Sequence, residues 1–152
     1  MNYDQDNPGR MQLALTNQLL SEIHASGEAA YPEEGAGLLL GSSYGKTKQV
    51  KAILPVANTR EDGARHNRYA LTPEDYLQGE LEAARRGLDV LGVYHSHPDH
   101  PNHPSEFDRE WAMPWFSYLI TSIRAGKAEA SRSWLLNMER TAFDEEEIVI
   151  EE

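Results

Sequence analysis

Residues 88–108 read LDVLGVYHSHPDHPNHPSEFD, and this stretch decides how the rest of the chain is interpreted. Its first part, residues 88–95, is mostly apolar and predicts a buried β-strand. A loop rich in proline and histidine follows. The S-x-x-D pattern of residues 105–108 is a helix-capping signature, which predicts a short helix through Trp111 or Ala112. The stretch therefore predicts a strand, a loop and a short helix.

Two histidines stand at the end of this strand. In an extended chain, residues two apart point to the same side, so His95 and His97 can converge on one point while Ser96 faces away. Asp108 lies in the first turn of the short helix, where the helix dipole favours a carboxylate. Two imidazoles and one carboxylate, with a fourth position open, form the ligand set of a catalytic zinc site. The pattern predicts a metal site of this kind.

A hydrolytic zinc site also needs a base for water and a hydrogen-bond donor for the oxyanion. Glu34, which precedes the glycine-flanked apolar segment 35–41, is the first candidate for the base, and Glu33 is the second. Ser105 is the candidate donor. Ser105 and Asp108 also form the capping pair of the short helix, and the two roles are compatible.

The pattern His95-Ser96-His97, then Ser105 and Asp108, fits H-S-H-x7-S-x2-D and resembles the JAMM motif of the MPN/JAB-domain zinc metalloproteases. Residues 31–41, YPEEGAGLLLG, resemble the same family's E-x-x-G-x-x-x-G segment. This resemblance assigns the catalytic glutamate to Glu34 rather than Glu33. It covers roughly residues 11–140 and implies one Zn²⁺ per chain, held by His95, His97 and Asp108, with Glu34 and Ser105 as catalytic residues.

The resemblance also implies a substrate. Many relatives carry cysteine where this chain has Ala36, and the chain has no room for the insertions with which eukaryotic members grip polyubiquitin. It is similar to the compact bacterial stand-alone type. The resemblance therefore implies a metallopeptidase or isopeptidase that cuts an amide after the C-terminal Gly-Gly of a ubiquitin-like or sulfur-carrier protein. The alternatives are a non-catalytic MPN scaffold and a RadC-type, DNA-repair-associated protein.

Apolar spacing and capping residues predict the other elements. Helices are expected from Thr16 to about Tyr31 and from Thr72 to about Arg86, and the second should present Leu77, Leu81 and Ala84 on one side. Further strands are expected at 35–41, 48–58, 115–123, 133–138 and 148–150. Together they predict an α/β (α+β layered) fold, a single mixed, largely antiparallel sheet flanked by helices, resembling the JAB1/MPN (cytidine-deaminase-like) fold. Residues 1–10 are expected to be a flexible tail and 11–152 a single domain.

Composition excludes several classes of function. The 152 residues include no cysteine, which excludes disulfide scaffolds, thiolate zinc clusters and cysteine nucleophiles. The 25 acidic and 14 basic residues give a formal net charge of -11, which disfavours nucleic acid and anionic membranes as partners. The N-terminus lacks a signal pattern, so a cytoplasmic location is expected. The oligomeric state stays open.

Three smaller expectations concern segments outside the motif. His100 and His103 are expected to be exposed, with a weak second metal site or substrate contact as the alternative. The acidic run 144–147 is expected to be a solvated turn before an edge strand. Residues 59–71 are expected to face the carrier through their basic side chains, which are Arg60, Arg65, His66 and Arg68.

Overall fold

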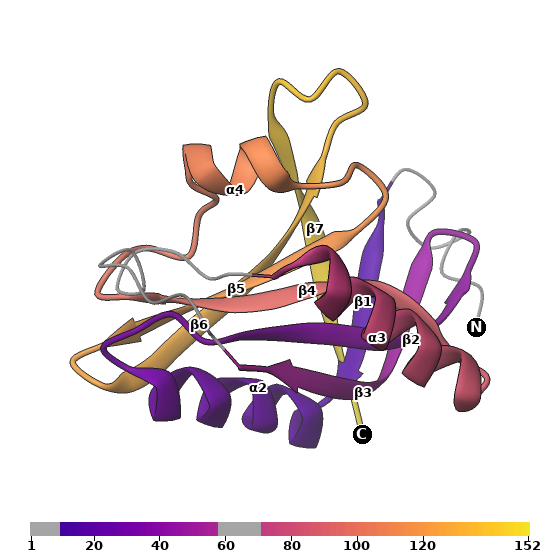
Figure 1. The fold of residues 1–152 in the computed structure, drawn as a ribbon. Coiled ribbons are helices and arrows are strands. Elements are labelled where there is room, and N and C mark those ends of the chain that lie inside the picture. The colour runs from indigo at the N-terminus through magenta and orange to yellow at the C-terminus, as the bar shows by residue number, and fades with distance from the viewer. Residues whose placement is uncertain (1–9, 58–70) are drawn as a thin grey trace.

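The computed structural model describes residues 10–57 and 71–152 (Figure 1). Its elements, in chain order, are β1 (Gln12–Thr16), α2 (Asn17–Ala30), β2 (Ala36–Tyr44), β3 (Thr47–Val56), α3 (Pro73–Arg85), β4 (Asp89–Pro98), α4 (Glu106–Trp111), β5 (Ser117–Arg124), β6 (Lys127–Leu136) and β7 (Phe143–Glu151). The predicted tail, apart from Arg10, and the predicted carrier-facing segment, apart from Leu71, lie outside the described residues.

The strands form one mixed sheet that closes on itself in the order β1-β3-β2-β4-β5-β6-β7. Within the described residues four strand pairs are antiparallel and three are parallel, which confirms the largely antiparallel sheet. The closure depends on β1, which pairs in parallel with both β3 and β7. The sequence pattern does not predict β1, because five residues are too few to distinguish a strand from the helix that follows.

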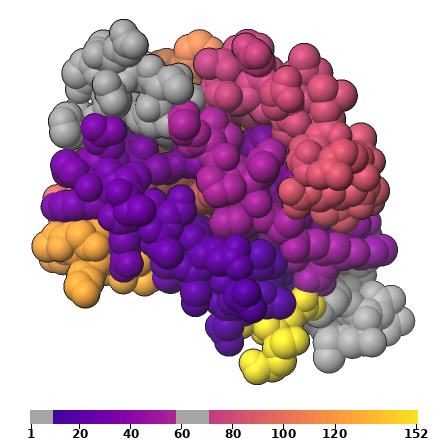
Figure 2. Space-filling view, turned by 60° about the horizontal axis from the view of Figure 1, so that its bottom comes forward, coloured from indigo at the N-terminus to yellow at the C-terminus, as the bar shows by residue number. Residues whose placement is uncertain are grey.

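Helices cover both faces of the sheet, as the layered prediction requires. Alternate residues of β2 divide between two apolar cores: Leu38 and Leu40 pack on the side of α3, whereas Leu39 packs with Ile23 of α2. A strand that is buried on both faces is expected to be apolar throughout. Figure 1 shows α2 and α4 on opposite sides of the sheet, and Figure 2 shows α2, in indigo, on the face that it covers.

The three helices within the described residues begin at the capping residues that the sequence predicts. Thr16 accepts a hydrogen bond from the Leu19 amide and caps α2. Thr72 and Asp75 form a reciprocal capping box at the start of α3, with Pro73 in its first turn. Such caps satisfy amides that have no partner within the helix, so these boundaries are fixed locally. For α4, the predicted start after Ser105 and end near Trp111 are confirmed.

The buried face of α3 consists of small residues. Leu77 and Leu81 are each 56% exposed, and the residues of α3 that are buried are Gly79 and Ala83. Gly79 allows a close approach, because a Cβ there would lie 2.2 Å from the Leu38 side chain. The side that carries Leu77, Leu81 and Ala84 is therefore exposed, and the small residues bring the helix closest to the sheet.

The acidic run 144–147 is also not the solvated turn that was expected. It lies within β7, which pairs with β6 and β1 and is therefore not an edge strand. Glu146 is buried, and the Ser133 hydroxyl donates to its Oε1 at 2.6 Å. Burial raises the pKa of Glu146, although Lys48 and the serine oppose the shift. Ser133 and Lys48 therefore compensate for the burial of an acidic side chain that the sequence pattern predicts to be at the surface.

Within residues 10–57 and 71–152, no helix is long and apolar enough to cross a membrane.

Replacing Gly92 by alanine should strongly destabilise the fold. Gly92 lies opposite Ser117 where β4 meets β5, and a Cβ there would lie 1.9 Å from the Ser117 carbonyl oxygen. Because that atom belongs to the backbone, the strands must separate, and we expect a loss of about 3 kcal/mol. Thermal unfolding should show Tm lowered by roughly 10 °C. Gly87→Asn is the control, since nothing lies within 4 Å and asparagine tolerates its positive φ. Equal Tm values for both variants would contradict the expectation.

Candidate metal centre

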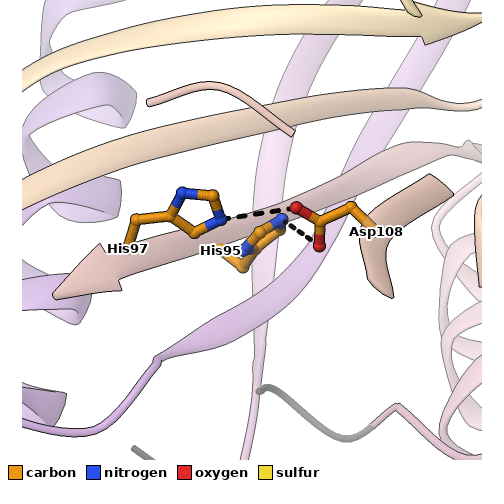
Figure 3. Close-up of side chains that lie close together, drawn as sticks. All are labelled: His95, His97 and Asp108. Carbon is orange, nitrogen blue, oxygen red and sulfur yellow. Dashed lines mark ion pairs between the residues drawn. The ribbon is translucent and has the colours of Figure 1, made fainter. Parts of the chain in front are cut away.

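The loop between β4 and α4 brings three buried side chains together, as Figure 3 shows. His95 and His97 extend from β4, and Asp108 from the first turn of α4. The His95 Nε2 lies 3.4 Å from Asp108 Oδ1, and the His97 Nε2 lies 3.4 Å from Asp108 Oδ2. The structure therefore places at one point the three side chains that the sequence predicts as ligands.

The spacing of these atoms fits a metal ion between them. Each residue offers one ligand atom, and these atoms all lie within 4.8 Å of one another. A separation of 3.4 Å is long for a hydrogen bond, which is usually about 2.7–3.2 Å. Two ligands at about 2.0–2.1 Å from a tetrahedral ion are themselves roughly 3.3 Å apart. The donor set, two nitrogens and a carboxylate, is one that zinc accepts.

His97 is held in the orientation that a ligand needs. Its Nδ1 lies 2.8 Å from the Pro101 carbonyl oxygen, which can only accept a hydrogen bond. The ring proton therefore belongs on Nδ1, and Nε2 directs its lone pair at Asp108. Metal-binding histidines in proteins usually make this second contact, because it fixes both the tautomer and the ring plane. The role of Pro101 was not predicted, since a contact made by a backbone carbonyl leaves no signal in residue type.

The electrostatics of the three groups favour a cation. Burial lowers the pKa of His95 to about 4, against the attraction of Asp108. Burial also lowers the pKa of His97, but the nearby Asp108 carboxylate and the Pro101 carbonyl outweigh it, and that pKa is raised overall. For Asp108, burial opposes ionisation, yet the histidines hold its pKa well below the usual value. A metal ion entering here would supply the positive charge that the buried carboxylate favours.

The capping box of α4 orients the carboxylate. The Ser105 amide donates to Asp108 Oδ2 at 2.8 Å, and the Asp108 amide donates to the Ser105 hydroxyl at 3.1 Å. The same Asp108 carboxylate faces the two histidines. Asp108 can therefore cap the helix and face the metal position at the same time, as expected. The serine hydroxyl accepts in this contact and retains its own hydrogen as a donor.

Glu34, and not Glu33, reaches the cavity beside these groups. Glu34 is 5% exposed, and its Oε1 lies 3.8 Å from His95 Nδ1. A cavity of about 300 Å³ is lined by Glu34, His97, His100, Pro101, His103 and Ser105. Glu33 is only half-buried and is not among those lining residues. Of the two glutamates, Glu34 is thus the one that borders the cavity.

Ser96 joins the Glu34 segment to the ligand strand. The Gly35 amide donates to the Ser96 hydroxyl at 2.8 Å, and the Ser96 amide donates to the Gly35 carbonyl at 2.9 Å. Its predicted place behind the ligands is confirmed. His100 and His103 are exposed, as expected, and both line the cavity.

Residues 16–137 match the model of a protein family described as "Prokaryotic homologs of the JAB domain". The chain belongs to this family. A "Desampylase" from Haloferax volcanii is 35% identical over 116 residues, covering 74% of this chain and 81% of the relative. A "Probable TtuB-protein conjugate cleaving protease" from Thermus thermophilus is 30% identical, covering 74% of each chain.

Solved structures agree with this JAB-family fold. The solution structure of a protein from Desulfitobacterium hafniense has a TM-score of 0.80 and 31% identity, covering 92% of this chain and 93% of that one. A JAB1/MPN domain protein from Archaeoglobus fulgidus, at 18% identity, has a TM-score of 0.53, covering 93% of this chain and 98% of the other. The predicted fold class is confirmed.

This JAB-family chain also has an apolar groove of about 700 Å³. Its lining includes Tyr76 of α3, Phe107 and Trp111 of α4, and Trp115. Trp111 and Trp115 are exposed. Because α4 carries both Asp108 and Trp111, the groove and the metal centre share one helix. Exposed apolar surface of this kind is typical of sites that bind another protein.

Proposed function

We propose that the protein is a zinc-dependent metallopeptidase or isopeptidase that hydrolyses the amide bond after the C-terminal Gly-Gly of a ubiquitin-like or sulfur-carrier protein. The observation that carries the proposal is the buried His95, His97 and Asp108 group with Glu34 beside it. Membership in the JAB family supports it, as do relatives named for removing protein conjugates. The substrate class is taken from those relatives.

His95, His97 and Asp108 would hold one zinc ion per chain. Their Nε2 and carboxylate atoms face one another at distances that suit a tetrahedral ion, and three protein ligands leave a fourth position for substrate chemistry. When bound there, zinc supplies the Lewis acidity that makes water a nucleophile near neutral pH.

Glu34 would act as the base and then as the acid. Its carboxylate accepts a proton as the water oxygen bonds to the substrate carbonyl carbon, and delivers that proton to the leaving nitrogen as the carbon–nitrogen bond breaks. Ser105, which also lines the cavity, would donate its free hydroxyl hydrogen to the developing oxyanion. Both roles need only small movements of groups that already border one cavity.

The apolar groove supports a protein substrate rather than a small polar one. Trp111 and Trp115 of its lining are exposed, and Trp111 lies on the same helix as Asp108. Leu77 and Leu81 of α3, outside the lining, are exposed as well. We place the body of the carrier against this surface, so that its C-terminal tail extends past α4 to the metal.

The test is incubation with candidate carriers that bear an extension after Gly-Gly, read by intact mass. The zinc-loaded protein should remove the extension and leave a mass ending at the second glycine. Protein stripped by a chelator should be inactive until zinc is restored. A carrier whose last glycine is changed to valine is the control, and it should resist cleavage because the side chain narrows access to the carbonyl. Cleavage that persists in the stripped protein would overturn the proposal.

A further inference from the structure

The loop of residues 99–104, here called the histidine loop, holds the carbonyl that orients His97. The Pro101 oxygen in this loop accepts the hydrogen bond from His97 Nδ1. Pro101 and Pro104 have no amide hydrogen, so the loop has few donors with which to fix its own backbone. At its start, the Asp99 amide donates to the Ile123 carbonyl at 2.6 Å, and the His100 amide lies 3.5 Å from the His97 carbonyl. Side chains from the sheet supply further contacts on either side of Pro101.

Two side chains donate hydrogen bonds to the backbone carbonyls on either side of Pro101. The Ser122 hydroxyl of β5 donates to the His100 oxygen at 2.7 Å. The Trp134 Nε1–H of β6 donates to the Asn102 oxygen at 3.0 Å. A third contact closes the arrangement, because the Asn102 side-chain amide donates to the Ala130 oxygen at 3.0 Å. The loop is thus tied to both strands at the residues adjacent to Pro101.

Ser122 and Trp134 are far less exposed than the loop residues that they contact. Ser122 and Trp134 are each 8% exposed and lie within the closed sheet, where Ser122 pairs with His97 itself. The Trp134 ring also lies 5.0 Å from the His103 ring. In contrast, His100, Pro101 and His103 are exposed. The hydrogen bonds from Ser122 and Trp134 therefore connect the exposed loop to buried side chains of the sheet.

The first residue of the loop has separate anchors. The Ala125 amide donates to Asp99 Oδ1 at 2.8 Å, and the Tyr31 hydroxyl donates to Asp99 Oδ2 at 2.7 Å. Loss of the Trp134 or Ser122 contact should therefore loosen the middle of the loop and leave its start in place.

We propose that Trp134 and Ser122 are positioning residues of the metal centre, which act by fixing the Pro101 carbonyl against His97 Nδ1. They touch neither metal nor substrate. Their effect reaches the ligand through one carbonyl, which selects the tautomer and the ring plane of His97. The inference rests on the zinc site proposed above and adds to it a part of the fold that no sequence motif marks.

The experiment compares zinc affinity and stability in Trp134→Phe, Ser122→Ala and the double variant. Trp134→Phe keeps an aromatic ring and removes the N–H donor, while Ser122→Ala removes one hydroxyl. Contacts that orient a metal ligand contribute about 10-fold to 100-fold in affinity, so each single change should weaken zinc binding about threefold to tenfold and the double change more. Competition with a chromogenic chelator measures the dissociation constant.

Thr16→Ala is the control, because it removes the cap of α2 and should cost about 1 kcal/mol without touching the loop. Its zinc affinity should equal that of the unmodified protein. A second readout is the Nδ1–H resonance of His97 in the zinc-loaded protein, which should exchange faster with water in the Trp134 and Ser122 variants than in Thr16→Ala.

Two results separate the proposals. An unmodified protein that binds no zinc would overturn the proposed function. Zinc binding by the unmodified protein, with the same affinity in Thr16→Ala and in the double variant, would overturn the positioning role alone.

Discussion

Glu34→Gln should retain zinc and lose turnover of the carrier substrate by about 100-fold to 10,000-fold, the usual contribution of general acid–base catalysis. Glutamine has nearly the shape of glutamate, so the buried position beside His95 should stay filled. It cannot accept the proton of the attacking water or return one to the leaving nitrogen. Since Glu34 is not among the three grouped ligands, the metal should stay bound.

The measurement pairs zinc content with single-turnover cleavage of an extended carrier. Glu33→Gln is the matched control, because it makes the same chemical change one residue away on a half-buried side chain outside the cavity lining. It should retain its rate. If Glu34→Gln turned over normally and Glu33→Gln did not, the base would be Glu33 and the assignment would be wrong.

Asp108→Ala should abolish stoichiometric zinc binding. Asp108 directs Oδ1 at His95 and Oδ2 at His97, and without this side chain two imidazoles remain as protein ligands. The change also removes the acceptor of the Ser105 amide, which should cost about 1 kcal/mol of stability in the metal-free protein. Asp108→Asn retains an amide oxygen for that contact, so it should lose zinc with a smaller loss of stability.

Asp75→Ala makes the same capping change at α3, where the Thr72 amide donates to Asp75. It should lower Tm as Asp108→Ala does in the metal-free state, and bind a full equivalent of zinc. Elemental analysis gives the metal content, and unfolding of chelator-treated protein gives the stability. A full equivalent of zinc in Asp108→Ala would contradict the ligand assignment.

A structural feature could be predicted from the sequence when the contacts that produce it lie within a few residues. Helix starts at Thr16, Thr72 and Ser105 follow from contacts within three residues, and they were predicted correctly. The convergence of His95 and His97 follows from strand geometry alone. Asp108 comes to the same point because a short loop ends in a capping box.

The remaining features depend on distant partners. The inward face of α3 is set by how closely Gly79 approaches Leu38, not by the apolar spacing that favours Leu77 and Leu81. Glu146 is buried because Ser133 and Lys48 meet it across the sheet. The Pro101 carbonyl and the Trp134 donor come from the path of the backbone. The pattern of residue types along one segment cannot predict contacts with residues that are distant in the sequence.

The pairing of β1 with β7 has a consequence for how the chain folds. Gln12 lies opposite Glu147 and Thr16 opposite Glu151, so the ring of strands cannot close until residues 143–151 have been synthesised. Contacts between residues this far apart in sequence raise the contact order, which slows folding. Until then one edge of β1 has no partner, and an open strand edge is a site of mispairing between chains. The metal ligands lie on β4 and α4, which precede β7 in the sequence. The segment that carries them can therefore form before β7 closes the ring of strands.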